Sequence, residues 1–260
     1  MPDFSVITYE TSDDHVATIT LNRPDRMNSF NQQMLMDMAA AWQQIRHDDD
    51  VHAVVLRAAG DRAFCSGLDV VDRLDDPITL WDDPDPSLYL GAKHQKCYKP
   101  VVAAVHGIVA GGAMYWLNEV DIIISSDDAT FFDPHVTYGM TSVLEPIGMS
   151  QFVPFREALR WALMGLDERV SPQRMKEIGL ISEVVSREAL WPRAHEIAAI
   201  LANKHPVAMQ GTVKVMWDSI WDRFGDIDRW GIRYVRAGNA IGENEVDRGN
   251  TTRPKWRLRD

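Results

Sequence analysis

Residues 99–113 read Lys-Pro-Val-Val-Ala-Ala-Val-His-Gly-Ile-Val-Ala-Gly-Gly-Ala. The apolar run at 101–105 is typical of a strand buried inside a parallel sheet. The glycine pair Gly111–Gly112 then opens a segment that we expect to be helical through Leu117. Because the first N–H groups of a helix have no carbonyl partner, this N-terminus could hold an anion or an oxyanion. Alternatively, the two glycines serve only to let a helix and a strand pack closely.

Strands and helices alternate on both sides of this stretch. Runs of apolar or β-branched residues predict three more strands, at residues 16–21, 52–58 and 121–125. A turn at 22–25 and a helix that Asn31 would cap are expected between the first two strands. This order predicts an α/β fold with right-handed crossover connections.

Beyond about Phe152 the chain is expected to be helical. Apolar spacing and the break at Pro206 predict helices at residues 187–203, 206–224 and 226–240. Two segments are too polar for a core element. Residues 72–86 contain six aspartates and three prolines and are expected to form an exposed acidic loop, and the tail at 247–260 is polar and basic.

Composition excludes several classes of protein. The 260 residues include 27 Lys and Arg against 38 Asp and Glu, a net charge of −11, so a global basic surface for nucleic acid is missing. No apolar run is long enough for a membrane span, and we expect no membrane association of that kind. Cys65 and Cys97 are too few for a disulfide framework and suit a reducing compartment. Because the first ten residues also lack a signal peptide pattern, we expect a cytoplasmic protein.

A second glycine-containing turn is expected at Ala63-Phe-Cys-Ser-Gly-Leu-Asp69, after the end of a strand. Backbone N–H groups in such a turn can face a ligand. The nucleophile-elbow pattern GxSxG is absent, which argues against Ser66 as a nucleophile. Neither a dinucleotide-binding GxGxxG nor a phosphate-binding GxxxxGK[ST] pattern is present. We also expect no metal site, because His47 with Asp48–Asp50 is better explained as a solvated helix end.

Together these segments resemble the crotonase (enoyl-CoA hydratase/isomerase) superfamily over about residues 4–240. The stretches that carry the resemblance are Thr18–Asn28, Ala63–Asp69, Lys99–Ala113, Asp121–Ser125, Arg169–Pro172 and Ile178–Val185. The resemblance implies a ββα-superhelix spiral over residues 1–200, which contains the acyl-CoA site. Residues 201–260 would form a C-terminal helical region and tail that pack on neighbouring subunits, in a homotrimer or a dimer of trimers.

The resemblance further implies that the ligand is an acyl-CoA thioester, with coenzyme A as part of the substrate and no separate cofactor. Two backbone N–H groups, which map to Leu68 and Gly112, would hold the thioester carbonyl oxygen and stabilise negative charge on it. Asp69 would fix the turn that aims them. The coenzyme A moiety would lie along residues 23–27 and 64–70, with Lys255 near the phosphates. The residues that map to its binding are Arg23, Arg26, Met27, Phe64, Ser66, Asp69 and Val70.

The sequence departs from the family pattern at both catalytic glutamates of its hydratases. The aligned positions hold Tyr115 and His135. His135 titrates near neutrality and could act as a general acid or base, or it could be a hydrogen-bonded structural histidine. Tyr115 could donate a proton or form an aromatic wall of the acyl pocket. Asp133 could orient His135, or it could cap a turn.

Glu145 is a further candidate for the proton-transfer residue. Beside Val143, Leu144 and Ile147 its carboxyl would be partly desolvated and its pKa raised, which suits proton transfer. The alternative is a surface glutamate before Pro146. His106 stands where the family usually has asparagine, and we expect it to be a hydrogen-bonding core residue.

Bulky residues in the stretch 140–149 predict a substrate other than a short linear enoyl-CoA. Two functions stay open from the sequence. The first is an active acyl-CoA hydratase, isomerase or carbon–carbon lyase in which His135 or Glu145 carries the proton. The second is a non-catalytic acyl-CoA-binding homologue, favoured by the loss of both glutamates. Thioester hydrolysis is a third and weaker possibility.

Overall fold

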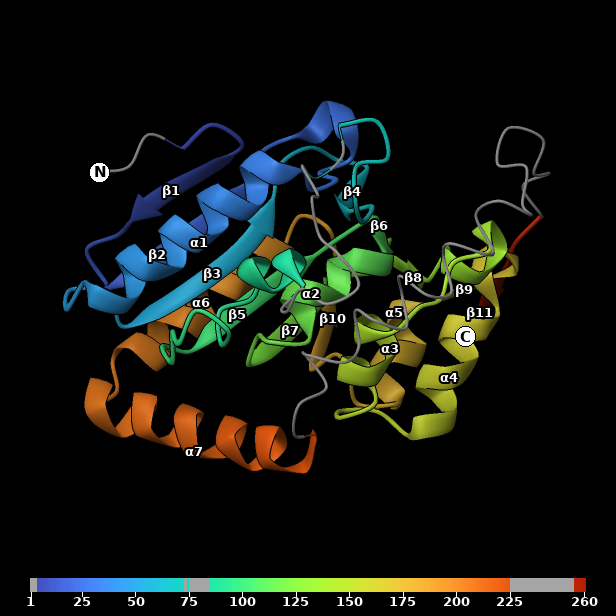
Figure 1. The fold of residues 1–260 in the computed structure, drawn as a ribbon. Coiled ribbons are helices and arrows are strands. Elements are labelled where there is room, and N and C mark those ends of the chain that lie inside the picture. Colours follow the sequence, from blue (N-terminus) through green and yellow to red (C-terminus); the bar gives the residue numbers. More distant parts are fainter. Residues whose placement is uncertain (1–3, 73, 75–84, 225–254) are drawn as a thin grey trace.

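The computed structural model describes residues 4–72, 74, 85–224 and 255–260 (Figure 1). A six-stranded sheet has the order β1–β2–β3–β5–β7–β10. Its strands are β1 (Ile7–Thr11), β2 (Val16–Leu21), β3 (Ala53–Ala58), β5 (Val101–Val105), β7 (Ile122–Ser126) and β10 (Glu183–Val185). All neighbours in it are parallel except β1 and β2. The expected strands at 16–21, 52–58, 101–105 and 121–125 are therefore confirmed.

A second, five-stranded sheet lies beside the first, in the order β11–β9–β8–β6–β4. Its strands are β4 (Ala63–Cys65), β6 (Ile108–Ala110), β8 (Thr130–Phe132), β9 (Glu168–Val170) and β11 (Arg257–Arg259). Three long strands of the first sheet each lead directly into a short strand of the second: β3 into β4, β5 into β6 and β7 into β8. This repeated two-strand step is the ββα spiral that the resemblance implies.

Seven α-helices and five short 3₁₀ helices are described around the sheets. The α-helices are α1 (Gln32–His47), α2 (Met114–Leu117), α3 (Leu144–Met149), α4 (Phe155–Leu163), α5 (Pro172–Glu177), α6 (Leu190–Ala202) and α7 (Pro206–Phe224). Short 3₁₀ helices are η1 (Pro24–Arg26), η2 (Pro86–Leu90), η3 (Gly111–Ala113), η4 (His135–Tyr138) and η5 (Gly165–Asp167). The helices expected near 187–203 and at 206–224 are confirmed.

The core lies on both faces of the six-stranded sheet. Because side chains alternate across a strand, successive residues of β3 contribute to different clusters. Val54 and Leu56 belong to the larger core, which includes the buried side of α1, whereas Ala53 and Val55 pack with α6. Figure 1 shows α1 and α6 on opposite faces of this sheet.

Helix α1 is fixed at both ends by side chains. As expected, Asn31 caps its N-terminus, where Oδ1 accepts a hydrogen bond of 3.1 Å from the Met34 N–H. At the other end the buried Lys99 Nζ donates 2.6 Å to the Ile45 carbonyl and also contacts the Asp48 carbonyl. These partners satisfy backbone groups that a helix leaves open at its termini.

The basic tail differs from the expectation of a polar segment. Residues 257–259 form β11, which pairs in parallel with β9. Arg259 Nη1 donates 2.6 Å to Glu157 Oε2, and its Nε lies 2.9 Å from Glu168 Oε1. Arg259 thus holds the tail against the buried Glu168 and the half-buried Glu157. Lys255 is exposed, and its contact with phosphate stays a prediction.

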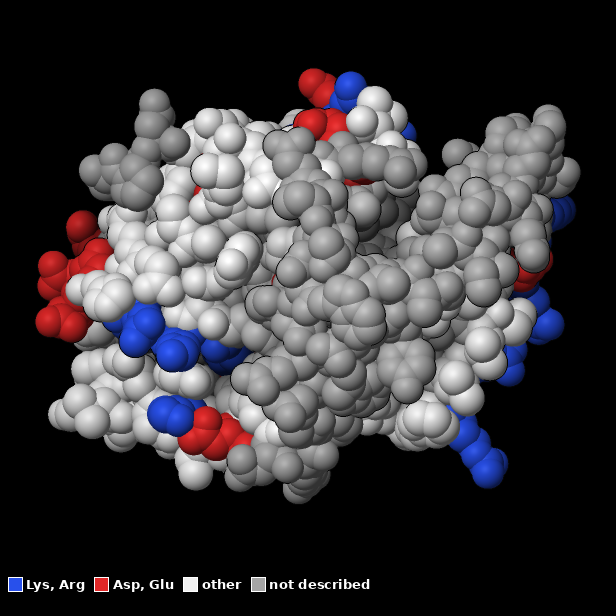
Figure 2. All heavy atoms as spheres, viewed as in Figure 1, with Lys and Arg blue, Asp and Glu red and all other residues white. Residues whose placement is uncertain are grey.

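Two expected segments lie outside the described residues. These are the helix at 226–240 and most of the acidic loop at 72–86. On the face shown in Figure 2, the described Lys and Arg side chains form separate small groups rather than one continuous patch. Within the described ranges, no helix has both the length and the apolarity needed to cross a bilayer.

Candidate active site

The turn after β4 meets the start of η3, which brings the two glycine segments together. The Phe30 N–H donates 2.9 Å to the Gly67 carbonyl, and the Asp69 N–H donates 2.8 Å to the Phe30 carbonyl. This parallel bridge pairs Phe30 with Leu68 through the residues that flank Leu68. The N–H of Leu68 itself therefore points away from Phe30.

Gly112 lies directly beside this turn. A Cβ added to Gly67 would lie 3.4 Å from the Gly112 nitrogen, and one added to Gly112 would lie 2.6 Å from Phe30 Cε1. Only glycine fits at position 112 without moving the phenylalanine ring. Because Gly112 is in the first turn of η3, its N–H has no carbonyl partner within that helix. Two N–H donors on adjacent loops can stabilise an oxygen that gains negative charge.

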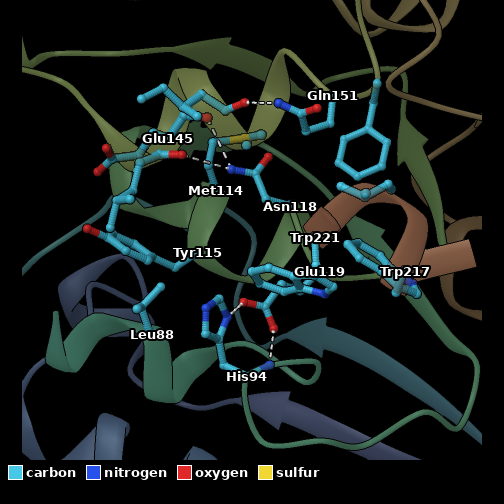
Figure 3. Close-up of a pocket in the computed structure, with 15 residues that line it drawn as sticks. Leu88, His94, Met114, Tyr115, Asn118, Glu119, Glu145, Gln151, Trp217 and Trp221 are labelled. Atoms are coloured by element: carbon cyan, nitrogen blue, oxygen red, sulfur yellow. Dashed lines mark hydrogen bonds and ion pairs between the residues drawn. The ribbon is translucent and has the colours of Figure 1, made fainter. Parts of the chain in front are cut away.

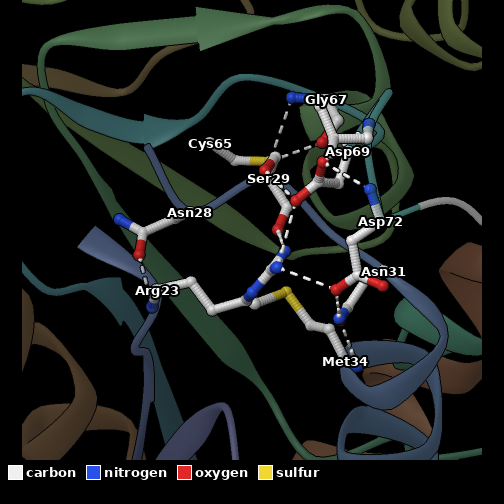
Figure 4. A network of polar contacts seen from close by, with 10 residues as sticks. Arg23, Asn28, Ser29, Asn31, Met34, Cys65, Gly67, Asp69 and Asp72 are labelled. Carbon is white, nitrogen blue, oxygen red and sulfur yellow. Dashed lines mark hydrogen bonds and ion pairs between the residues drawn. The ribbon is translucent and has the colours of Figure 1, made fainter. Parts of the chain in front are cut away.

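An internal ion pair fixes the Leu68 turn (Figure 4). Asp69 Oδ1 accepts 3.0 Å hydrogen bonds from the N–H groups of Val71 and Asp72, and Oδ2 lies 3.0 Å from Arg23 Nη2. Burial alone would raise the pKa of Asp69, but these N–H groups and the guanidinium outweigh it and lower that pKa. Asp69 thus holds the turn, as expected.

Apart from the buried Asp69, the six residues predicted to bind coenzyme A fall into three groups. Arg23 already has partners within the protein, since it pairs with Asp69 and donates a 2.6 Å hydrogen bond to the Ser29 carbonyl. Its guanidinium therefore stabilises the Leu68 turn rather than presenting a free cation. The side chain of Phe64 is fully buried against Trp116, so only its backbone could face a ligand, and its contact with coenzyme A stays a prediction. The other residues reach the surface, and their contact with coenzyme A stays a prediction: Arg26, Met27, Ser66 and Val70.

His135 lies between two carboxylates. It follows β8 and opens η4, and its ring Nδ1 and backbone N–H both contact Asp133 Oδ1, the backbone contact being 3.2 Å. Asp133 is fully buried, and its other oxygen accepts from the Ser142 hydroxyl. On the opposite side of the ring, Nε2 lies 3.7 Å from Glu145 Oε1. The structure therefore shows both alternatives for Asp133, because the same oxygen contacts the His135 ring and accepts the backbone N–H two residues further on, as a turn cap does.

Glu145 is in the first turn of α3 and is buried, which excludes the surface alternative. Burial raises the pKa of Glu145; His135 opposes that rise, and the charges of Asp133 and Asp85 reinforce it. Burial disfavours the imidazolium, but the charge of Glu145 and the hydrogen bond and charge of Asp133 raise the pKa of His135 to about 9. Glu145, chiefly because it is buried, and His135, because of its carboxylate neighbours, thus both have pKa values above their usual ones.

The imidazole ring and the glycine turn are in direct proximity. A Cβ added to Gly111, whose φ is +46°, would lie 3.4 Å from His135 Cε1. The ring therefore lies against the residue that precedes Gly112. His135 and the Gly111–Gly112 turn are therefore neighbours, although they come from different turns of the spiral.

Tyr115 lies one helical turn after Gly112, on α2. Its hydroxyl donates 2.9 Å to Asp85 Oδ2. Burial, and then the charges of Asp85 and Glu145, raise the pKa of Tyr115 well above its usual value, so the phenol stays protonated. Sequence reasoning missed Asp85, which it placed in the exposed loop. The signal was the Asp85-Pro86 pair, since Asp85 is the N-cap of η2 and accepts 2.8 Å from the Ser87 N–H.

A cavity of about 80 Å³ runs along α2 and under α7 (Figure 3). Its apolar lining is Leu88, Met114, Leu144, Ile147, Phe152, Trp217, Ile220 and Trp221. Its polar lining is His94, Tyr115, Asn118, Glu119, Glu145 and Gln151. Tyr115 and Glu145 thus line this cavity and also belong to the group of titratable residues around His135, which we call the acid–base cluster: Asp85, Tyr115, Asp133, His135 and Glu145.

Two other expectations concern buried groups. His106 is fully buried as expected, but neither ring nitrogen has a hydrogen-bond partner among the described residues, so the expected hydrogen bond is wrong. Burial raises the pKa of the Cys65 thiol to about 12, which keeps it protonated. Reactive thiolates have lowered pKa values, so Cys65 is a structural residue.

Comparison with known proteins identifies relatives over most of the chain. A family model described as enoyl-CoA hydratase/isomerase matches residues 11–221. An (E)-benzylidenesuccinyl-CoA hydratase of Thauera aromatica is 32% identical over 212 residues, which cover 79% of this chain and 80% of that protein. A 1,2-epoxyphenylacetyl-CoA isomerase of Escherichia coli strain K12 is 33% identical over 211 residues, 76% of this chain and 77% of that one.

Solved structures agree with this fold. The crystal structure of an enoyl-CoA hydratase/isomerase from Mycobacterium paratuberculosis is 37% identical, with a TM-score of 0.75 over 99% of this chain and 100% of that one. A probable enoyl-CoA hydratase from Mycobacterium thermoresistibile is 26% identical, with a TM-score of 0.82 over 92% of this chain and 97% of that one.

Proposed function

The chain belongs to the enoyl-CoA hydratase/isomerase family, the crotonase superfamily, and on this premise we propose that it transfers protons on the acyl group of a CoA thioester. The thioester carbonyl oxygen is held by the N–H groups of Leu68 and Gly112. Glu145 and His135 carry the proton. The observation that supports this most strongly is the contact of His135 with Glu145 on one side and with the Gly111–Gly112 turn on the other.

The N–H pair accounts for the electronic part of the reaction. When water adds to the double bond of a conjugated thioester, negative charge moves onto the carbonyl oxygen. The same happens when a proton leaves a carbon that is next to the carbonyl or conjugated with it. Preorganised N–H donors stabilise that charge without rearranging, and the loss of one such donor typically lowers kcat by about 10²–10³. The Arg23–Asp69 pair keeps the Leu68 donor in place.

Glu145 and His135 account for the proton. In hydration, Glu145 takes a proton from water as the oxygen bonds to the acyl chain, and the pair returns a proton to the carbon next to the carbonyl. In isomerisation, Glu145 takes the proton from one carbon and the pair returns it to another. The imidazolium of His135 favours the anionic form of Glu145, while Asp133 holds the ring so that Nε2 faces Glu145.

The buried acid–base cluster favours an enzyme over the non-catalytic alternative. Asp133 and Glu145 are each at most 5% exposed, and burying ionisable groups is costly unless they are paired. A protein that only binds an acyl-CoA through backbone N–H groups has no need of this arrangement. Perturbed titratable groups in a cavity are instead typical of active sites.

The cavity supports a bulky, aromatic acyl group. Four aromatic side chains line it: Tyr115, Phe152, Trp217 and Trp221. Two relatives are named for acyl groups that contain a phenyl ring, a benzylidenesuccinyl and an epoxyphenylacetyl group. We therefore infer an arylalkenoyl-CoA or a similar ester as the substrate class.

An assembly of three or six copies agrees with exposed apolar side chains on the outer helices. On α4, Phe155, Leu159 and Leu163 are exposed at a spacing of one helical turn. On α7, Val207, Val215 and Met216 are also exposed. Light scattering on the purified protein should give a mass of about three or six chains, and a mass of about one chain would contradict this part of the proposal.

The proposed activity is tested by incubating the protein with cinnamoyl-CoA and with crotonyl-CoA and following the absorbance of the conjugated thioester. We expect the signal of the aryl ester to fall, with no release of free thiol. Release of free coenzyme A would instead identify thioester hydrolysis. If neither ester nor any other member of a broad enoyl-CoA panel is converted, the chain is a binding protein and the proposal is wrong.

A further inference from the structure

Asn118 has a buried hydrogen-bond acceptor that none of the described residues uses. Its Oδ1 atom is shielded from solvent and has no hydrogen-bond partner among the described residues. Such atoms are rare in folded proteins, because a buried polar atom without a partner costs free energy. Asn118 also lines the cavity that contains Tyr115 and Glu145.

The orientation of the Asn118 amide is set by its surroundings. Nδ2 donates 3.1 Å to the Glu145 carbonyl and is 3.5 Å from the Leu144 carbonyl, both on α3. Flipping the amide would place Oδ1 against two carbonyl oxygens, which repel it. Figure 3 shows the nitrogen turned toward these carbonyls and the oxygen turned away from them.

The backbone of α3 is shaped to receive this amide. A Cβ added to Gly148 would lie only 2.2 Å from Asn118 Nδ2, so the close approach of α2 and α3 requires glycine at that position. Asn118 is therefore held firmly, with one end of its amide used by the protein and the other end directed at the cavity.

Glu119, which follows Asn118 in the sequence and also lines the cavity, already has partners within the protein. Glu119 Oε2 accepts 2.6 Å and 2.9 Å hydrogen bonds from the N–H groups of Lys93 and His94, and Oε1 contacts His94 Nδ1. Both oxygens of Glu119 thus have partners within the protein. Asn118 Oδ1 is therefore the acceptor to which a ligand could donate a hydrogen bond.

Asn118 lies at a fixed distance from the proposed carbonyl site. It follows Gly112 by six residues along η3 and α2, a rise of about 9 Å along the helix axis. Tyr115 lies between them on the same helix. An acyl group whose carbonyl is held at Gly112 therefore reaches Asn118 with its far end when it has about the length of a phenylpropenoyl group.

On the basis of the proposed function, we infer that the substrate's acyl group carries a hydroxyl at its far end, which donates a hydrogen bond to Asn118 Oδ1. The substrate class is then a hydroxyaryl acyl-CoA, or an ester of similar length with a terminal hydroxyl. Only a donor satisfies Oδ1, so the site discriminates against an ester that ends in hydrogen. Asn118 is a specificity-determining residue that acts at the end of the acyl group opposite the thioester.

A pair of saturated esters tests this without turnover. Calorimetric titration compares 3-(4-hydroxyphenyl)propanoyl-CoA with 3-phenylpropanoyl-CoA, which differ only in the hydroxyl group. We expect the wild-type protein to bind the hydroxyl ester about 10-fold more tightly. Equal affinity for the two esters would overturn this inference alone, whereas binding of neither would contradict the proposed function itself.

Two variants separate the acceptor from the tether to α3. Asn118→Leu has nearly the same shape but no acceptor, and we expect it to lose the preference for the hydroxyl ester. Asn118→Asp keeps an acceptor but loses the amide donor, and we expect both affinities to fall while the preference persists. Loss of the preference in both variants would make Asn118 only a positioning residue and overturn the inference. Circular dichroism verifies that each variant is folded, and the wild-type comparison stands even if one is not.

Discussion

His135 Nε2 lies 3.7 Å from Glu145 Oε1, while Nδ1 of the same ring contacts Asp133. Asp133 thus holds one side of the imidazole ring, and the other side faces the carboxylate of Glu145. The sequence comparison by motif predicts Tyr115 and His135 in place of the two family glutamates, and the structure places the His135 ring beside the glycine turn and the buried carboxylate of Glu145 beside that ring. This relationship is the basis for assigning the chain an acid–base function.

Removing the carboxylate of Glu145 should abolish most of the activity. Glu145→Gln keeps the shape of the side chain but cannot accept a proton, so we expect kcat to fall about 10²–10⁴-fold with little change in KM. Glu177→Gln, at an exposed glutamate on α5, is the matched control and should be neutral. Steady-state kinetics on an aryl ester checks this, and a Glu145→Gln enzyme with normal kcat would assign the proton to another group.

The pH dependence should show an alkaline limb near pH 9. His135 has a pKa raised to about 9 by its carboxylate neighbours, so it loses its proton only above that pH. Asp133→Asn removes one of these charges, and we expect the limb to move to lower pH. The kcat/KM profiles of the wild type and Asp133→Asn measure this. The same limb in both would show that His135 is not the titrating group.

The same shift makes a prediction about stability. A group whose pKa is higher in the folded state stabilises the fold fully below its unfolded pKa, near 6.5, and this contribution is lost as the pH rises through the folded pKa, near 9. The free energy of unfolding of wild type minus that of His135→Gln should therefore decrease from pH 6 to pH 10, by about 1–3 kcal/mol. Denaturant titrations at several pH values measure it, and a difference that grows with pH would reverse the assignment.

Gly112→Ala should damage both the donor site and the packing beneath it. The new Cβ would lie 2.6 Å from the Phe30 ring, which forces the turn away from Leu68. We expect a loss of about 10²-fold or more in kcat, since a displaced N–H donor no longer faces the oxygen. Gly211→Ala is the control, because a Cβ there meets nothing within 4 Å and should stabilise α7 by up to about 1 kcal/mol.

Arg23→Gln should destabilise the Leu68 turn indirectly, by removing the ion pair with Asp69. It leaves Asp69, which is 5% exposed, without its cationic partner, and breaking such a buried pair typically costs about 3–5 kcal/mol. We expect a lower melting temperature and a lower kcat/KM. Thermal unfolding and kinetics on the same preparation check both, and an unchanged melting temperature would show that the backbone N–H groups alone hold Asp69.

Much of the fold could be predicted because its signals are local. The run at 101–105 is apolar on both faces since it lies in the middle of a parallel sheet, and Asn31 caps α1 through a residue only three positions away. The burial of Glu145 was suggested by its apolar neighbours in the sequence. In each case the residues that decide the structure are close together along the chain.

The features that could not be predicted depend on distant partners. Asp85 stands in a stretch whose composition predicts an exposed loop, yet it is buried and accepts a hydrogen bond from Tyr115, thirty residues along the chain. The tail forms β11 because Glu157 and Glu168 meet Arg259 about a hundred residues away in sequence. His106 was expected to find a partner, and only the fold shows that neither ring nitrogen has one among the described residues.

The central claim is that Glu145 and His135 move a proton on an acyl-CoA. The measurement that tests it most directly is mass spectrometry of an aryl enoyl-CoA incubated with the protein in D₂O. The account predicts deuterium bound to carbon in the product, with the mass of added D₂O for hydration or a shifted double bond for isomerisation, and no incorporation with Glu145→Gln. Absence of carbon-bound deuterium with the wild-type protein across a panel of esters, or equal incorporation by the variant, would contradict it.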